Sequence, residues 1–354
     1  MNAPFATVHE LIAIADLSDS RVAARIESYV AEKAGSPFHR PAWLRAVERG
    51  TGQRAFGLIA EKRGILRGWL PLTEVRSPFF PAALVSSGFA VAGGALGDTA
   101  TTAARLCEAG TELAGRLSCA SVELRGPHAP ADWTFVTGKH ANFTAPIAAD
   151  DDAQLLSIPR KQRAEVRKGL ERPFTLSVGS TEHDRAAHYA VYAASVRNLG
   201  TPVFPRALFD AVLDEFGPDA DILSLRLDGT PIASVLTIYH RGVAMPYWGG
   251  GTYAARASRA NERLYYELML HARRRGCHTF DFGRSKVGSG AFAYKKNWGF
   301  EPTPLSYAVW NAPGSVARDI DPTSEAYSAK IALWKRLPLG IANRLGPLIA
   351  KGLA

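Results

Sequence analysis

The sequence predicts an α+β fold in which one order of secondary-structure elements occurs twice. The chain has 354 residues, more than a single core usually supports, and its 47% apolar and 21% charged content is typical of a globular protein. Each half shows a helical pattern, two apolar runs around a turn, a further helix and a strand. We therefore expect two tandem units, each a mixed sheet flanked by helices, at 1–150 and 151–312, and an amphipathic helical tail at 313–354.

The first half contains these elements in order. A helical pattern at 21–33 precedes a second helix that has Pro41 near its first turn. Two strands are expected around a turn at 62–64, and a glycine-rich loop follows them. A long helix at 99–117 and a strand at 120–126 complete the first unit.

The second half repeats this order. Helical patterns occur at 188–202 and 206–216. An Asp-Gly pair at 228–229, between two apolar runs, is a strong β-hairpin signal. An amphipathic helix that ends at Gly276 then precedes a strand at 278–283. The same unit is therefore expected twice.

The net charge and the cysteine content limit the kinds of binding partner and the cellular compartment that we expect. A formal charge of +9 favours anionic partners such as phosphates, nucleic acid or acidic lipid headgroups. The three cysteines are too few and too scattered for a disulfide framework or a zinc site, so we expect a reducing cytoplasm and no metal. The N-terminal segment lacks the pattern of a signal peptide, and no segment reaches the roughly 18 apolar residues of a membrane span.

The strand and glycine-rich turn at 278–290 form the main site candidate. If Phe280 and Phe282 point into the core, Asp281 lies on the opposite side of the strand and faces a cleft. Asp281 then either caps the turn or accepts or orients the proton of an attacking amine. The glycines allow backbone N–H groups to approach a phosphate or carbonyl oxygen. The other candidate residues of this turn are Arg284, Gly288, Ser289 and Gly290.

Two adjacent lysines follow the turn in a short helical segment. Lys295 or Lys296 either interacts with the helix C-terminus through the helix dipole or acts as a catalytic cation. Trp298 is expected in the core or in the wall of the substrate pocket.

A cationic helix is expected at 160–172. Residues three or four positions apart share a helix face, so its basic side chains form a stripe. The stripe is either a solvated surface or a clamp for phosphate oxygens, which arginine can bind with two hydrogen bonds. Its residues are Arg160, Lys161, Arg163, Arg167 and Lys168. Asn261, at a later helix start, either joins Arg256 and Arg259 at a phosphate or caps the helix.

The segment 326–354 has five basic residues, no acidic residue and many apolar ones. Pro338 and Pro347 are expected to break it into short helices. Basic amphipathic helices with tryptophan lie in the membrane interface, held by apolar burial and anionic headgroups. A helix of this kind can equally pack back on the protein, and the sequence leaves both alternatives open.

Several of these stretches resemble one family. The segments 158–169, 197–202, 280–290 and 294–305 are similar to FemAB-like proteins of the PEP-CTERM exopolysaccharide system. These belong to the GNAT superfamily, and Fem peptidyltransferases and bacterial ceramide synthases are wider relatives. The resemblance implies two tandem GNAT-like units, with an N-acyltransferase site in the second.

The resemblance also implies substrates and roles. The donor would be acyl-CoA, acyl carrier protein or aminoacyl-tRNA, used as a co-substrate without a tightly bound cofactor. The acceptor would be an amine on a membrane-associated lipid, such as a sphingoid base, or on a cell-envelope glycan. In Fem ligases a lysine of the closing helix serves acyl transfer, and Lys295 or Lys296 matches it. Tyr294 lies one residue farther from Gly299 than the usual spacing of the general acid, and "RASRAN" replaces the glycine-rich pyrophosphate signature of acetyl-CoA users.

A second hypothesis comes from another class of protein. The chain would then be an RNA-binding module, or a non-catalytic scaffold of an envelope or exopolysaccharide assembly. Against RNA binding, the sequence lacks aromatic arrays for base stacking and the known RNA-binding signatures. Under the acyltransferase hypothesis we expect a cytoplasmic protein that is peripheral on the inner face of the membrane.

Overall fold

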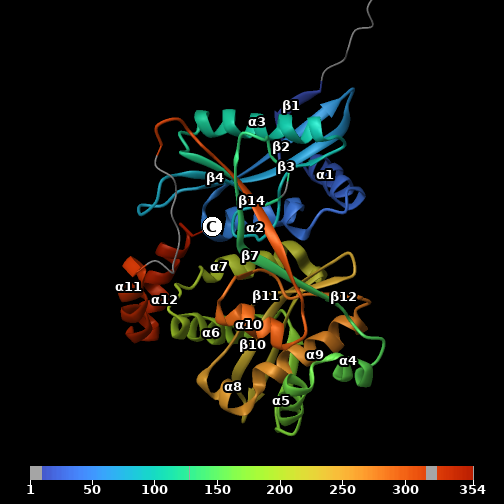
Figure 1. The fold of residues 1–354 in the computed structure, drawn as a ribbon, viewed down its shortest axis with the longest axis vertical. Helices are drawn as coiled ribbons and strands as arrows, with labels where there is room; N and C mark the ends of the chain where they lie inside the picture. The colour runs from blue at the N-terminus through green and yellow to red at the C-terminus, as the bar shows by residue number, and fades with distance from the viewer. Residues whose placement is uncertain (1–9, 127, 316–324, 354) are drawn as a thin grey trace, which may run out of the picture. The chain divides into compact units, whose positions relative to one another are not determined.

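The computed structural model describes residues 10–126, 128–315 and 325–353 (Figure 1). The chain divides into two compact units that are not contiguous in sequence. The first comprises Met1–Val136, Ser306–Asp319 and Lys351–Ala354, and the second Thr137–Leu305 and Ile320–Ala350. Mixed sheets flanked by helices confirm the expected α+β class. The boundaries expected from the sequence, after residues 150 and 312, remain a prediction.

The first unit is a mixed sheet with the strand order β1-β2-β3-β4-β6-β14. Its strands are β1 (Leu11–Ile14), β2 (Arg54–Lys62), β3 (Ile65–Val75), β4 (Ala83–Ser86), β5 (Leu96–Gly97), β6 (Ser121–Leu124) and β14 (Pro302–Asn311). Its helices are α1 (Ser20–Glu32), η1 (Pro37–His39), α2 (Pro41–Thr51) and α3 (Ala100–Arg116). The β4 and β6 strands are parallel, and the other pairs in this order are antiparallel.

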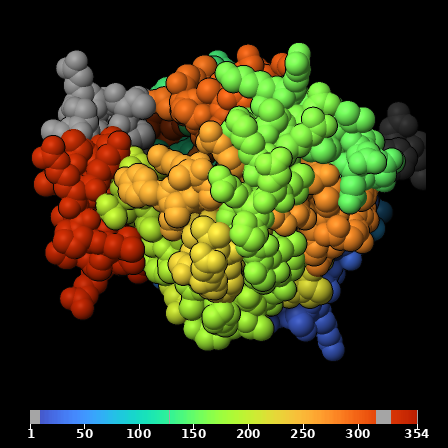
Figure 2. Space-filling view, turned by 90° about the horizontal axis from the view of Figure 1, so that it is seen from below, coloured from blue at the N-terminus to red at the C-terminus, as the bar shows by residue number. Residues whose placement is uncertain are grey.

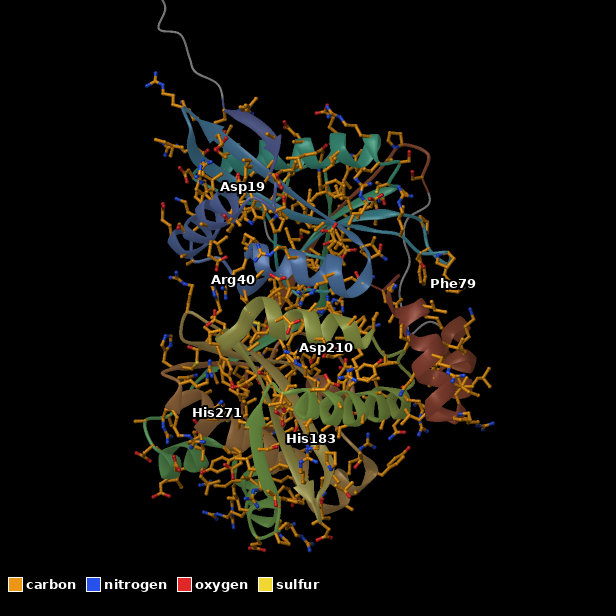
Figure 3. All side chains as sticks on the ribbon, turned by 180° about the vertical axis from the view of Figure 1, so that it is seen from behind. Asp19, Arg40, Phe79, His183, Asp210 and His271 are labelled. Carbon is orange, nitrogen blue, oxygen red and sulfur yellow. The ribbon has the colours of Figure 1, made fainter. Side chains whose placement is uncertain are left out.

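Two of the helices in this unit, α1 and α3, begin at side-chain caps. The Asp19 carboxylate accepts a hydrogen bond from the Arg21 N–H at the start of α1 (Figure 3), and the Thr99 hydroxyl accepts one from the Thr102 N–H at the start of α3. The expected helices, hairpin and strand of this unit are confirmed.

The second unit has the strand order β7-β12-β11-β10-β9-β8. Its strands are β7 (Thr134–Pro146), β8 (Thr175–Gly179), β9 (Ala220–Leu227), β10 (Thr230–His240), β11 (Val243–Gly251), β12 (Thr279–Asp281) and β13 (Ser285–Lys286). Its helices are α4 (Asp151–Ser157), α5 (Arg160–Leu170), α6 (Glu182–Leu199), α7 (Arg206–Phe216), η2 (Gly217–Asp219), α8 (Tyr253–Ser258), α9 (Ala260–Arg274), α10 (Gly290–Asn297), α11 (Glu325–Arg336) and α12 (Leu339–Ala350). Asp228 and Gly229 both have positive φ, of 50° and 76°, which confirms the expected tight hairpin.

Helices α9 and α6 cover opposite faces of the second sheet. A Cβ at Gly249 or Gly251 of β11 would meet Tyr265 or Asn261 of α9, whereas one at Gly250 would meet Ser195 of α6. Because successive strand residues point to opposite faces, the glycine run lets both helices approach the same strand closely. This places the N-terminal turn of α9 against the end of β11.

The tail differs from the expectation in one respect. Pro338 separates α11 from α12, but the expected break at Pro347 is wrong, because Pro347 lies inside α12. Gly346, the residue before Pro347, is buried against Val203. Within the described ranges, no helix is long and apolar enough to cross a membrane.

Candidate active site

The candidate site begins where two parallel strands of the second unit separate. Strands β11 and β12 pair only at Val243–Thr279 and Ala244–Phe280, and β11 then continues to Gly251 paired with β10. Asp281 ends β12 directly after this separation. The carboxyl ends of parallel strands are a common position for ligand sites in mixed sheets.

Asp281 caps the turn that follows it. Its Oδ1 atom accepts a hydrogen bond from the Gly283 N–H at 2.8 Å, and the Asn142 side chain also hydrogen-bonds to the carboxylate. Phe280 and Phe282 are buried in the core, as the alternation predicts, and Asp281 is half-buried. Burial raises the pKa of Asp281 above its ordinary value, while the hydrogen bonds and Lys295 act in the opposite direction. Asp281 therefore caps the turn, and a catalytic role for its negative charge remains a prediction.

The glycine-rich turn is open on its outer side. Gly283 and Gly288 have φ of 72° and 78°, the left-handed region that favours glycine. A Cβ added at Gly283, Gly288 or Gly290 would meet nothing within 4 Å. The Ser289 hydroxyl caps α10 by accepting a hydrogen bond from the Phe292 N–H at 3.2 Å. The turn therefore leaves room for a ligand beside its backbone.

Lys295 is buried in this turn. Its Nζ donates to the carbonyl oxygens of Gly283 at 2.8 Å and Arg284 at 3.1 Å, and only 9% of the residue is exposed. The ammonium lies 5.5 Å from the centroid of the Phe143 ring and 5.8 Å from that of Phe282. Burial lowers the pKa of Lys295 to about 8; the Arg284 charge adds to this shift and the Asp281 charge opposes it.

The structure separates the two adjacent lysines. Lys296 is exposed, whereas Lys295 shares the inner face of α10 with Phe292, three positions earlier. Arg284 is half-buried and acts electrostatically on Lys295. Of the predicted catalytic residues, Asp281, Arg284 and Lys295 therefore lie together, and Lys296 points to solvent.

Tyr294 and Trp298 line the core side of α10. Their ring centroids are 6.3 Å apart, and both contact Tyr265. Burial raises the pKa of Tyr294 well above its ordinary value. Trp298 is only 2% exposed, so it packs in the core and offers little surface to a substrate.

The predicted cationic stripe lies on the outer face of α5. Gln162, Val166 and Gly169 form its buried face, and Gly169 packs against the Arg259 backbone at the start of α9. The predicted stripe residues are exposed except Arg163, which is half-buried; they are Arg160, Lys161, Arg163, Arg167 and Lys168. Their role at a ligand stays a prediction.

One carboxylate connects the stripe with the second predicted phosphate contact. Glu165 pairs with Lys168 at 2.7 Å and with Arg259 at 2.5 Å. These contacts lower the pKa of Glu165, chiefly through its hydrogen bond to Lys168. The two cationic segments that lie far apart in sequence therefore meet at the N-terminus of α9.

The expected helix cap at Asn261 is wrong. The N-cap of α9 is Arg259, which has a left-handed φ of 63°, and the Arg259 side chain makes no capping hydrogen bond. Asn261 lies one position inside the helix, with its side chain against Gly251. A long helix whose N-terminus has no side-chain cap favours anions, so a phosphate contact at Asn261 remains consistent with the geometry.

Glu262 is a site candidate that sequence reasoning missed. It is half-buried in the first turn of α9, and burial raises its pKa. Its charge also contributes, after burial, to the raised pKa of Tyr294, so the two side chains lie near each other. In the sequence Glu262 has the position of an ordinary helix residue, and no local signal marks it.

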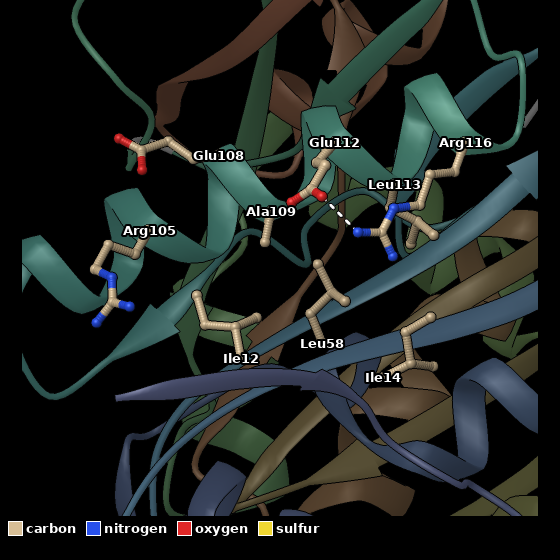
Figure 4. A pocket seen from close by; sticks show the side chains of 9 residues that line it. All are labelled: Ile12, Ile14, Leu58, Arg105, Glu108, Ala109, Glu112, Leu113 and Arg116. Carbon is tan, nitrogen blue, oxygen red and sulfur yellow. Dashed lines mark hydrogen bonds and ion pairs between the residues drawn. The ribbon is translucent and has the colours of Figure 1, made fainter. Parts of the chain in front are cut away.

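A surface hollow in the first unit lies apart from these residues. It has a volume of about 320 Å³ and lies between α3 and the strands β1 and β2 (Figure 4). Its floor is apolar, and the Arg116–Glu112 ion pair lies at its rim. No predicted site residue lines it. Among the described residues, no group of His, Cys, Asp and Glu could hold a metal ion.

Residues 159–296 match the model of a family described as "Acetyltransferase (GNAT) domain". The structure is similar to that of FemX, with a TM-score of 0.63, 15% identity and coverage of 83% of this chain and 96% of FemX. It is also similar to a tandem GNAT protein from the clavulanic acid biosynthesis pathway, with a TM-score of 0.58, 10% identity and coverage of 87% and 100%. A third similar structure is the C-terminal domain of a putative lysylphosphatidylglycerol synthetase from Agrobacterium fabrum, with a TM-score of 0.55, 13% identity and coverage of 83% and 93%. No curated protein matches the sequence.

The matched segment contains the separated strands, the glycine-rich turn and the buried lysine. The chain therefore carries a GNAT acetyltransferase domain in its second unit. Its fold is similar to that of FemX and to that of the tandem GNAT protein, which confirms the expected fold class. The class of protein that this domain defines is an N-acyltransferase.

Proposed function

We propose that the second unit transfers an acyl or aminoacyl group from an activated donor to an amine. In this reaction the amine nitrogen attacks the donor carbonyl, a C–N bond forms, and the C–S or C–O bond to the leaving group breaks. The proton lost by the amine passes to a base and a proton is supplied to the leaving group. The site must therefore stabilise an oxyanion and hold a phosphate-bearing donor.

The buried position of Lys295 is the observation that carries the proposal. An ammonium has three donors, and two of them bond Gly283 and Arg284. The third is proposed to bond a developing oxyanion beside the open turn. A cation fixed in this way needs little reorganisation during the reaction, which is the main source of electrostatic catalysis. Asp281, at the same turn, is proposed to orient the attacking amine.

Donor binding is assigned to the cations around the N-terminus of α9. Acyl-CoA, acyl carrier protein and aminoacyl-tRNA all carry phosphate groups in addition to the activated carbonyl. The uncapped helix end, with Arg259 and the α5 stripe beside it, suits such a group. The same surface supports each of the three donors.

The proposed acceptor is an amine on a membrane-associated lipid, such as a sphingoid base, or on a cell-envelope glycan. One protein of similar fold is named as a synthetase of lysylphosphatidylglycerol, an aminoacylated lipid, which supports acyl transfer to lipids. The enzyme would then work in the cytoplasm, on the inner face of the membrane.

Incubation of the purified protein with each donor and a long-chain amine tests the proposal. Mass spectrometry should detect an amide-linked acyl chain with at least one of the three donors. The Lys295→Met variant should form little product. RNA binding that weakens steeply with salt, without transfer from any donor, would instead favour the RNA-binding alternative.

A further inference from the structure

We infer that the outer face of α12, together with the adjoining part of α11, is a docking surface for an anionic lipid bilayer. This surface, the tail patch, consists of Leu333, Lys335, Arg336, Ile341, Arg344, Leu345 and Leu348. The inference concerns a site other than the catalytic turn and does not depend on the reaction proposed there.

The inner face of α12 is made of small residues. Ala342, Gly346 and Ala350 are four positions apart and buried. At Gly346 the fit is close, because a Cβ there would lie 2.9 Å from the backbone of Val203. Helix α12 lies beside α6 (Figure 1), and Leu339 packs on the small apolar cluster that contains Val203. The helix is therefore attached to the second unit by a face that large side chains could not form.

Helix α11 is attached to the same helix of the second unit. The Arg197 guanidinium of α6 donates a hydrogen bond to the Lys335 carbonyl oxygen at 3.2 Å. The side chains of Ile331 and Lys335 both lie against Gly200, where a Cβ would approach Ile331 to 2.5 Å and the Lys335 Cε to 3.1 Å, although Lys335 is exposed overall. These contacts fix which side of the tail faces outward.

The outer face carries the large apolar residues. Ile341, Leu345 and Leu348 are spaced by four and three positions and are 47%, 44% and 61% exposed. Leu333 of α11 is 65% exposed. A surface helix normally buries its large apolar side chains and exposes small or polar ones, and α12 has the reverse arrangement. In Figure 2 the tail, in red, stands out from the yellow and green surface of the second unit.

The charges around this apolar stripe identify its partner. Lys335, Arg336 and Arg344 are exposed, and none forms an ion pair with a described residue. The segment 326–354 contains no acidic residue. Apolar side chains surrounded by uncompensated cations suit the headgroup region of an anionic bilayer. A symmetric contact with a second copy would place like charges opposite each other, which disfavours a dimer through this face.

Co-sedimentation of the full-length protein with vesicles tests the inference. We expect binding to vesicles of phosphatidylcholine and phosphatidylglycerol, and little binding to phosphatidylcholine alone. Replacing Ile341, Leu345 and Leu348 by serine should weaken binding at least about tenfold. Replacing Lys335, Arg336 and Arg344 by glutamine should weaken it by about a hundredfold, since each basic residue at an anionic surface contributes on the order of a fivefold factor.

A matched control uses apolar residues of the first unit with comparable exposure. Leu11, Ile14 and Ile65 are 68%, 53% and 55% exposed, and their serine variants should bind as the unchanged protein does. The melting temperature measured by circular dichroism and the rate of transfer to a soluble amine should be unchanged in the two tail variants and in the control. A loss of vesicle binding alone therefore distinguishes this inference from the catalytic proposal. Unchanged vesicle binding in both tail variants, or equal loss in the control, would overturn the inference. So would a dimer that only the tail substitutions dissociate, without any vesicle binding.

Discussion

Lys295 donates a hydrogen bond to the Gly283 carbonyl oxygen at 2.8 Å and thereby closes the glycine-rich turn onto α10. From the sequence alone, the glycine-rich turn and α10 are known only to follow each other along the chain. The hydrogen bond shows that they are also in contact. It also places the ammonium within electrostatic reach of Asp281, whose own hydrogen bond to the Gly283 N–H holds the other side of the turn. The turn, the cation and the carboxylate therefore form one arrangement.

The first prediction concerns the lysine pair. Lys295→Met should lower kcat by roughly 100- to 1,000-fold with little change in the apparent KM for the donor, because an oxyanion contact is made mainly in the transition state. Lys296→Met is the matched control and should behave as the unchanged enzyme, since Lys296 is exposed. Initial rates across donor concentrations measure both. Equal effects of the two substitutions would contradict the assignment.

The second prediction is a pH dependence. Because the pKa of Lys295 is lowered to about 8, the ammonium that stabilises the oxyanion is lost as pH rises through that value. We expect kcat to fall above about pH 8, and Lys296→Met to retain this decline. A rate that stays constant or increases from pH 7 to pH 9.5 would show that the charged form of Lys295 is not required.

A stability measurement accompanies the second prediction. The folded pKa of Lys295 lies below the ordinary value of 10.5, so the unfolded chain binds this proton more tightly. The buried ammonium therefore destabilises the fold fully below about pH 8, and this cost disappears as pH rises towards 10.5. Lys295→Met should keep or raise the Tm at pH 7, as measured by thermal denaturation. A large fall in Tm would mean that the lysine is mainly structural.

The third prediction separates the two roles of Asp281. Asparagine can still accept the hydrogen bond from the Gly283 N–H, so Asp281→Asn should leave the Tm nearly unchanged. It should nevertheless lower kcat clearly, because the carboxylate charge is lost. Asp281→Ala removes the cap as well and should cost about 0.5–1.5 kcal/mol of stability. If Asp281→Asn keeps full turnover, Asp281 is a turn cap alone.

The fourth prediction tests the cationic stripe. Arg163→Ala and Arg167→Ala should raise the apparent KM for a phosphate-bearing donor about ten- to a hundredfold with little change in kcat. Binding of this kind holds the ground state and the transition state about equally. Arg116→Ala, on α3 of the first unit, serves as a surface control. Unchanged KM values in both stripe variants would show that the basic face of α5 is only a solvated surface and does not bind the donor.

The fifth prediction concerns Glu262. Burial raises its pKa, and a carboxylate of raised pKa near Tyr294 is suited to accept a proton from the incoming amine. Glu262→Gln should lower kcat and should remove the acidic limb of the pH–rate profile. Glu267→Gln, five positions farther along α9, is the control. A profile that is identical in Glu262→Gln would exclude this carboxylate as the base.

The sequence predicts the repeated elements because their signals are local. The turn at Asp228–Gly229 and the helix end at Gly276 depend on backbone conformations that few residues adopt, and both have positive φ. Strand β7 was not predicted, because its first half lacks the regular alternation of apolar and polar residues that marks a half-buried strand. Its partners β12 and β13 lie more than a hundred positions later in the chain, so the pairing is set by tertiary structure.

The site was predicted only in part for a related reason. The sequence shows two adjacent lysines, but the choice between them depends on which face a short helix turns inward. The apolar residues of α10 form one continuous run at 291–294, which does not mark a single face. Likewise, Glu262 becomes notable only through burial against residues of another helix. Local patterns thus identify the turn, and long-range packing selects the residues within it.

The most direct test of the account is mass spectrometry of lipids and envelope glycans from three cultures. The first expresses this protein, the second expresses Lys295→Met, and the third lacks the protein. The account predicts an amide-linked acyl or aminoacyl product that is present in the first culture and absent, or strongly reduced, in the other two. Equal amounts of such a product in the first two cultures would contradict the role of Lys295, and no amide difference between the first and third would contradict acyl transfer itself.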